Sequence, residues 1–167
     1  DIGAGGGVFV SDKSHVTITD SEIQENTGTR GGGVYVEKDS IVEVEDSTIQ
    51  GNIATDDIKN SNMNIGDGGG IYTTDSAVHV SNSTIQMNPA NGSSGGGGIF
   101  GSHSTVTVVN KSTITENTAA DPHRADVGGI AVTQDRTLTV TGDSEITANS
   151  AADCGGGSYA EGSFLDV

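Results

Sequence analysis

Short stretches in which apolar and polar residues alternate recur along the whole chain. Residues 41–45 (IVEVE) and 105–109 (TVTVV) show an apolar residue at every second position. This period of two is typical of a β-strand with one buried face. A burst of glycines followed by an aliphatic residue precedes each stretch, and a Ser-x-Ile-x-x-Asn segment follows it. Each unit therefore predicts three short strands: one after the glycines, one in the alternating stretch and one in the Ser-x-Ile-x-x-Asn segment.

The unit repeats throughout the sequence, with coils that begin near residues 5, 31, 68, 96, 127 and 155. A unit of about 26 residues with three strands cannot bury its own apolar face, whereas stacked units can. A β-propeller blade needs about 40–45 residues, so these units are too short for one. We predict one all-β parallel solenoid over residues 1–167, with about five and a half coils and no obvious cap at either end.

Equivalent residues of stacked coils lie about 4.8 Å apart and form columns. Ile and Val supply 30 residues against two Leu, which suits strands. The expected inward columns are Val16, Val42, Val78, Val106 and Leu138; Ile18, Val44, Val80, Val108 and Val140; and Ile23, Ile49, Ile85, Ile114 and Ile146. Stacked carboxamides can bond to one another and to turn backbone. We therefore expect a structural ladder of the asparagines that end each unit, namely Asn26, Asn52, Asn88, Asn117 and Asn149.

These units resemble the repeats of the right-handed parallel β-helix (pectin-lyase-like) superfamily. They are also similar to the passenger repeats of polymorphic outer membrane proteins. Those repeats pair a Gly-Gly-Ala-Ile type tetrapeptide with a Phe-x-x-Asn tetrapeptide; here Gly31-Gly32-Gly33-Val34 pairs with Ile49-Gln50-Gly51-Asn52. The resemblance implies a single-stranded right-handed parallel β-helix. It also implies a surface-displayed, adhesive protein.

Five of the six aromatic residues occupy one position after the glycines. Simple alternation with the inward aliphatic residues points these rings outward, where a strip of them can stack on sugars or on another protein. A turn beside the glycines that reversed the alternation would instead bury them as a stack. Both readings stay open for Phe9, Tyr35, Tyr72, Phe100 and Tyr159.

Candidate chemistry lies in the segments of variable length between each asparagine and the next glycines. Asp121-Pro122-His123-Arg124 resembles the Asp-Pro-His of alginate epimerases, so Asp121, His123 and Arg124 are weak catalytic candidates. Ordinary turn chemistry explains the segment equally well. No cofactor is expected, although calcium would suit the loop carboxylates at one corner, for which the weak candidates are Asp56, Asp57, Asp67, Asp121 and Asp126. Arg30 and Arg136 are expected to be solvated.

Charge and composition exclude several classes of protein. Seven Lys and Arg against 23 Asp and Glu give a net charge of −16, whereas nucleic-acid binding needs clustered positive charge. No apolar run approaches the about 18 residues of a membrane-spanning helix. One cysteine excludes a disulfide within this chain.

The sequence favours a non-catalytic structural or adhesive β-helix that is extracellular or at the cell surface. The expected ligands are glycans or surface proteins. We also expect the open coil ends to pair either with further copies of the chain or with further coils of a longer chain. The alternatives are a fragment of a carbohydrate-active β-helix enzyme of the polysaccharide lyase or uronate epimerase type, and a glycan-binding or ice-binding module.

Overall fold

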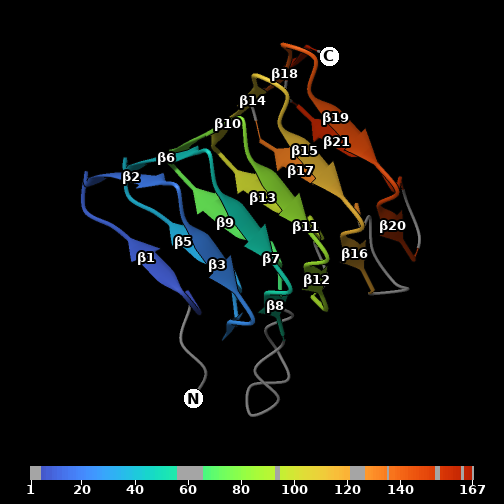
Figure 1. The fold of residues 1–167 in the computed structure, drawn as a ribbon, viewed down its shortest axis with the longest axis horizontal. Helices are drawn as coiled ribbons and strands as arrows, with labels where there is room; N and C mark the ends of the chain where they lie inside the picture. Colours follow the sequence, from blue (N-terminus) through green and yellow to red (C-terminus); the bar gives the residue numbers. More distant parts are fainter. Residues whose placement is uncertain are drawn as a thin grey trace.

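The chain winds into a parallel β-solenoid whose coils lie side by side along the long axis (Figure 1). The computed structural model describes residues 5–55, 66–92, 95–120, 127–134, 136–152, 155–162 and 164–166. Every strand pair is parallel, and the strands form four sheets, here named A to D in the order in which the chain enters them.

Each sheet takes one strand from each coil. Sheet A contains β1 (Val8–Val10), β5 (Val34–Val36), β9 (Ile71–Thr74), β13 (Ile99–Ser102), β17 (Ile130–Thr133) and β21 (Ser158–Glu161). Sheet B contains β2 (His15–Thr19), β6 (Ile41–Glu45), β10 (Ala77–Ser81), β14 (Thr105–Val109), β18 (Thr137–Val140) and β22 (Phe164–Asp166). Sheet C contains β3 (Glu22–Gln24), β7 (Thr48–Gln50), β11 (Thr84–Gln86), β15 (Thr113–Thr115) and β19 (Glu145–Thr147). Sheet D contains β4 (Thr27–Gly28), β8 (Ile53–Ala54), β12 (Pro89–Ala90), β16 (Thr118–Ala119) and β20 (Ser150–Ala151).

The prediction of an all-β parallel solenoid of about five and a half coils is confirmed, since β1 to β20 complete five coils and β21 and β22 begin a sixth. The short strand of sheet D was not predicted. It consists of two residues after each ladder asparagine, and Thr27 pairs there with Ile53. Two residues are too few for a period of two to appear in the sequence.

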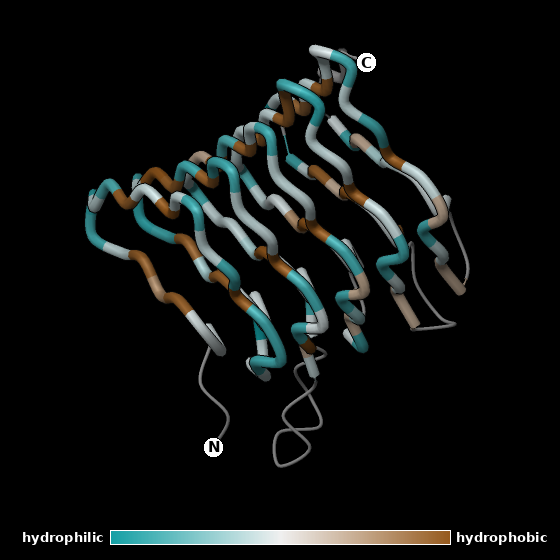
Figure 2. The backbone as a smooth tube through the Cα atoms, in the orientation of Figure 1, coloured by the Kyte–Doolittle hydropathy of each residue, from teal (hydrophilic) through white to brown (hydrophobic). Residues whose placement is uncertain are grey.

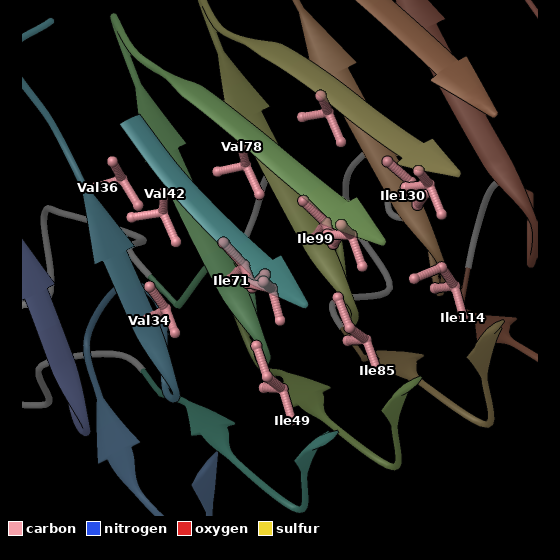
Figure 3. Close-up of a cluster of buried hydrophobic side chains, with 14 of the residues drawn as sticks. Val34, Val36, Val42, Ile49, Ile71, Val78, Ile85, Ile99, Ile114 and Ile130 are labelled. Atoms are coloured by element: carbon pink, nitrogen blue, oxygen red, sulfur yellow. The ribbon is translucent and has the colours of Figure 1, made fainter. Parts of the chain in front are cut away.

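The inward aliphatic residues stack in register to form one continuous core. Val42 pairs with Val78, which pairs with Val106, and the columns of sheets A and C continue in the same way. Figure 3 shows Ile49, Ile85 and Ile114 in a row across neighbouring strands of sheet C. In Figure 2 the hydrophobic positions recur at the same place in successive coils. The predicted columns are confirmed, and their members in the end coils, such as Val16, Ile23 and Ile146, are only partly buried.

The glycine bursts form the corner between sheets D and A, where the backbones of neighbouring coils lie in close contact. Gly31 and Gly68, each the first glycine of its burst, take a left-handed conformation with φ of +57° and +65°. The third has no room for a side chain. A Cβ on Gly70 would lie 2.6 Å from the carbonyl oxygen of Gly98 in the next coil and 3.0 Å from Cγ2 of Ile85. Any larger residue there would push two coils apart.

Gly70→Ala should therefore lower the free energy of unfolding by about 1–3 kcal/mol, the usual cost of overpacking a tight site. Gly155→Ala is the matched control, because a Cβ on Gly155 meets no atom within 4 Å. Urea unfolding followed by circular dichroism measures both variants. Equal effects at the two positions would contradict the close approach of the coils.

Candidate functional site

The ladder asparagines form a continuous row of hydrogen bonds through all five complete coils. Nδ2 of Asn26 donates to Oδ1 of Asn52 at 3.0 Å, and Nδ2 of Asn52 donates to Oδ1 of Asn88 at 3.1 Å. The row continues to Asn117 and Asn149, with both distances 2.9 Å. These contacts place the five side chains where the sequence expected them.

Asn88 uses all of its hydrogen-bonding capacity inside the protein. Its Oδ1 accepts the backbone N–H of Asn52 at 2.9 Å as well as the Asn52 carboxamide. Its Nδ2 donates to Oδ1 of Asn117 and to the carbonyl of Ile49 at 3.0 Å. The residue is fully buried. The ladder therefore satisfies backbone groups at the C-to-D corner that the sheets leave unpaired.

Serines form two further ladders that the sequence interpretation missed. At the B-to-C corner the backbone N–H of Ser47 donates to Oγ of Ser83 at 3.1 Å, and that of Ser83 donates to Oγ of Ser112 at 3.2 Å. At the A-to-B corner the same contact joins Ser40 to Ser76 at 3.1 Å. A serine recurs at both places in the repeat, which could have indicated a ladder. Serine is common in turns of every kind, however, so its recurrence there is a weak signal.

The aromatic residues form a stack outside the core. Ring centroids lie 5.3 Å apart for Phe9 and Tyr35, 5.2 Å for Tyr35 and Tyr72, and 5.4 Å for Tyr72 and Phe100. Strand alternation holds, since Val34 and Val36 belong to the main core and Tyr35 to a separate cluster with Val127 and Ala131.

The middle of this stack is buried, whereas an open binding strip would be exposed. Tyr35, Tyr72 and Phe100 are 5%, 7% and 5% exposed, whereas Phe9 is 55% exposed. Tyr159 packs against the other end of the cluster and is partly buried. The rings point outward, as alternation predicts, but the three inner rings of Tyr35, Tyr72 and Phe100 are buried in the stack. A binding role for the five residues stays a prediction.

Arg30 is only partly exposed, which corrects the expectation of a fully solvated side chain. Its backbone pairs with that of Asp67 in the next coil, and its Cζ lies 5.5 Å from the centroid of the Tyr72 ring. Its Nε is buried. The guanidinium therefore lies over the Tyr72 ring of the aromatic stack, where it makes a cation–π contact. Burial raises the pKa of the Tyr72 hydroxyl above its usual value.

A cluster of polar side chains lies beside the aromatic stack, just after the strands of sheet A. The Tyr35 hydroxyl donates to Oε2 of Glu37 at 2.7 Å, and Ser11 Oγ donates to Oε1 at 3.0 Å. Nζ of Lys38 lies 3.1 Å from Oε1 of Glu37. The bond from Tyr35, together with those from Lys38 and Ser11, lowers the pKa of Glu37 below its usual value. Burial and the Glu37 contact raise the pKa of Tyr35.

Most of the predicted catalytic and calcium candidates lie outside the described residues, namely Asp56, Asp57, Asp121, His123, Arg124 and Asp126. Asp67 is described and buried beside Arg30. Within the described ranges no group of three or more His, Cys, Asp or Glu side chains is arranged to hold a metal ion. The described part of the chain also contains no helix long and apolar enough to cross a membrane.

A shallow depression of about 250 Å³ lies on the outside of the A-to-B corner. It extends over four coils, and its lining residues are Asp39, Ser40, Ile41, Asp75, Ser76, Ala77, His103, Thr105 and Arg136. Sequence reasoning missed it, because these residues are far apart in the chain and meet only when coils are stacked in register.

The fold and its ladders define a parallel β-helix. A protein-family model described as the right-handed beta helix region matches residues 3–164, so the chain belongs to the right-handed β-helix family. No curated protein and no solved structure matches the chain.

Asn88→Ala should lower the free energy of unfolding by about 2–4 kcal/mol, because it leaves buried partners in two adjacent coils unsatisfied at about 1–3 kcal/mol each. The control is Asn26→Ala in the partly buried end coil, which should cost about 0.5–1.5 kcal/mol, the value of one hydrogen bond. Denaturant unfolding measures both. A neutral Asn88→Ala would contradict the role of the ladder.

The bond between Tyr35 and Glu37 predicts a pH-dependent stability. Because folding lowers the pKa of Glu37, ionised Glu37 stabilises the protein above its unfolded pKa of about 4.3, and this contribution is lost as the pH falls toward the folded value. Tyr35→Phe should therefore destabilise more at pH 7 than at pH 3. In a Glu37→Gln background the effect of Tyr35→Phe should not vary with pH, and a difference that persists there would refute the assignment.

Proposed function

We propose that this chain is a non-catalytic, extracellular structural and adhesive β-helix, either displayed at a surface or stacked end to end into a fibre. One observation carries the proposal: the polar residues that recur in every coil are engaged in hydrogen bonds between coils. Asn88 and Ser83, both buried, each bond to the equivalent residue of a neighbouring coil. The recurring chemistry of the repeat thus stiffens the scaffold.

The outer surface supports the adhesive part of the proposal. The outer face of sheet C carries rows of Thr and Gln, in which Gln86 bonds to Gln50 at 2.8 Å and Gln50 bonds to Gln24 at 3.1 Å. A stiff surface with a regular array of polar groups suits recognition of extended polar partners such as glycans. A net charge of −16 favours solubility and limits non-specific association.

The end strands support stacking. β1 to β4 at one end of the sheets, and β19 to β22 at the other, each have a described neighbour on one side only. Exposed edges are templates for further strand pairing. Further coils of the same kind, from the same polypeptide or from another copy, would continue both the sheets and the ladders.

The adhesive part of this proposal is tested by coating beads with the protein and measuring their retention on glycan-coated and cell surfaces, together with turnover of polyuronates. We expect retention and no release of unsaturated or epimerised uronate. Polyuronate turnover that is abolished by His123→Ala would overturn the proposal in favour of the carbohydrate-active enzyme.

The proposed end-to-end stacking is tested by electron microscopy of concentrated protein. We expect filaments that Val16→Lys abolishes, because Val16 is a partly buried core residue of an end coil and a charge there would meet the next core. Thr17→Lys on the exposed outer face of the same strand is the matched control and should leave filaments intact. Filaments that survive Val16→Lys would refute stacking through that end.

A further inference from the structure

The depression at the A-to-B corner exists because one column contains a small residue. Ala77 pairs with Ile41 in the coil before it and with Thr105 in the coil after it, and all three lie on the outer side of sheet B. Ile41 is 41% exposed, so its side chain forms an apolar wall beside the floor at Ala77. The hollow therefore presents a small apolar surface inside a rim of polar residues.

The rim carries charges of opposite sign at its two ends. Asp39, Asp75 and His103 occupy the same left-handed turn position in successive coils, with φ of 58°, 48° and 49°. Arg136 lines the hollow from the coil after His103. One end is thus acidic and the other carries the cationic and imidazole groups.

The two carboxylates at the acidic end are exposed. Neither Asp39 nor Asp75 forms an ion pair with a residue of the described ranges. The backbone N–H of Asp39 bonds to the carbonyl of Asp75 at 2.9 Å, which fixes the two residues in adjacent coils. The two backbones lie about one coil spacing apart, roughly 4.8 Å, so the carboxylates on them are close enough to repel each other and for a single ammonium group to donate to both.

We propose that this depression binds an amino sugar, with its ammonium group between Asp39 and Asp75 and its ring over Ala77. The apolar C–H face of a pyranose would pack on Ile41 and Ala77. His103 and Arg136 would donate to hydroxyl or ring oxygens at the opposite end. The volume of the hollow, about 250 Å³, is smaller than the roughly 300–1,000 Å³ usual for sites of drug-sized ligands. It therefore suits one sugar unit at the end of a chain.

This assignment rests on the proposed adhesive function and names the chemistry of its ligand. The test is isothermal titration of the intact protein with a glucosamine disaccharide, its N-acetylated form and a lysine-containing tripeptide. We expect the glucosamine disaccharide to bind, and affinity to fall at least tenfold on N-acetylation, which removes the charge, and at least tenfold for the tripeptide, which lacks the ring. Affinity should also fall as salt is raised, because the contact is between exposed charges.

Variants locate the binding. Ala77→Ile fills the hollow with the side chain that the preceding coil carries at the paired position, and it should abolish binding without lowering the melting temperature. Asp75→Asn should weaken binding at least tenfold. Asp143→Asn, on the exposed B-to-C corner, is the matched control and should bind as the parent does.

Two results would overturn the assignment. Equal affinity for the N-acetylated disaccharide or for the tripeptide would exclude recognition of an amino sugar. Unchanged binding in Ala77→Ile would move the site elsewhere, and Ala77→Thr, which copies the following coil, serves if Ala77→Ile fails to fold. If no disaccharide binds while protein-coated beads still adhere, this assignment fails and the proposed function stands.

Discussion

Hydrogen bonding between coils at the glycine corner is the constraint on which the rest of this structure depends. The backbone N–H of Gly33 reaches the carbonyls of Gly69 and Gly70 at 3.2 and 3.1 Å, and the same contacts recur along the stack. A side chain at the third glycine would block this approach. Glycine thus lets this corner keep the coil spacing that strand pairing in the four sheets requires, and that spacing brings the asparagine, serine and aromatic columns within contact distance.

The same constraint explains a composition that otherwise approaches that of a disordered chain. Twenty-six glycines and a net charge of −16 are unfavourable for an ordinary globular core. In a solenoid each coil needs only a few inward side chains, because the coils on either side complete their burial. Val44, Ile85 and Val108 are fully buried although each belongs to a coil of about 30 residues.

The sequence predicted the columns of this fold far better than it predicted its surface. Period-two alternation identified the inward residues, and the repeat placed Asn52 and Asn88 in one row, because both signals are local and recur. Exposure depends on what neighbouring coils place beside a residue. Alternation pointed Tyr72 outward correctly, yet the rings above and below it and the guanidinium of Arg30 bury it. The depression over Ala77 likewise depends on the register of four coils, which no single unit reveals.

The central claim is that the recurring polar side chains hold the coils together, and hydrogen exchange of the ladder carboxamides tests it most directly. The side-chain NH₂ protons of Asn52, Asn88 and Asn117 should exchange only through global unfolding, because these residues are fully buried and bonded to adjacent coils. The carboxamide of Asn82, which is exposed and donates to the Asp46 carboxylate, gives the reference rate for a hydrogen-bonded side chain at the surface. If the ladder protons exchanged as fast as those of Asn82, the ladders would not hold the stack and the account would be contradicted.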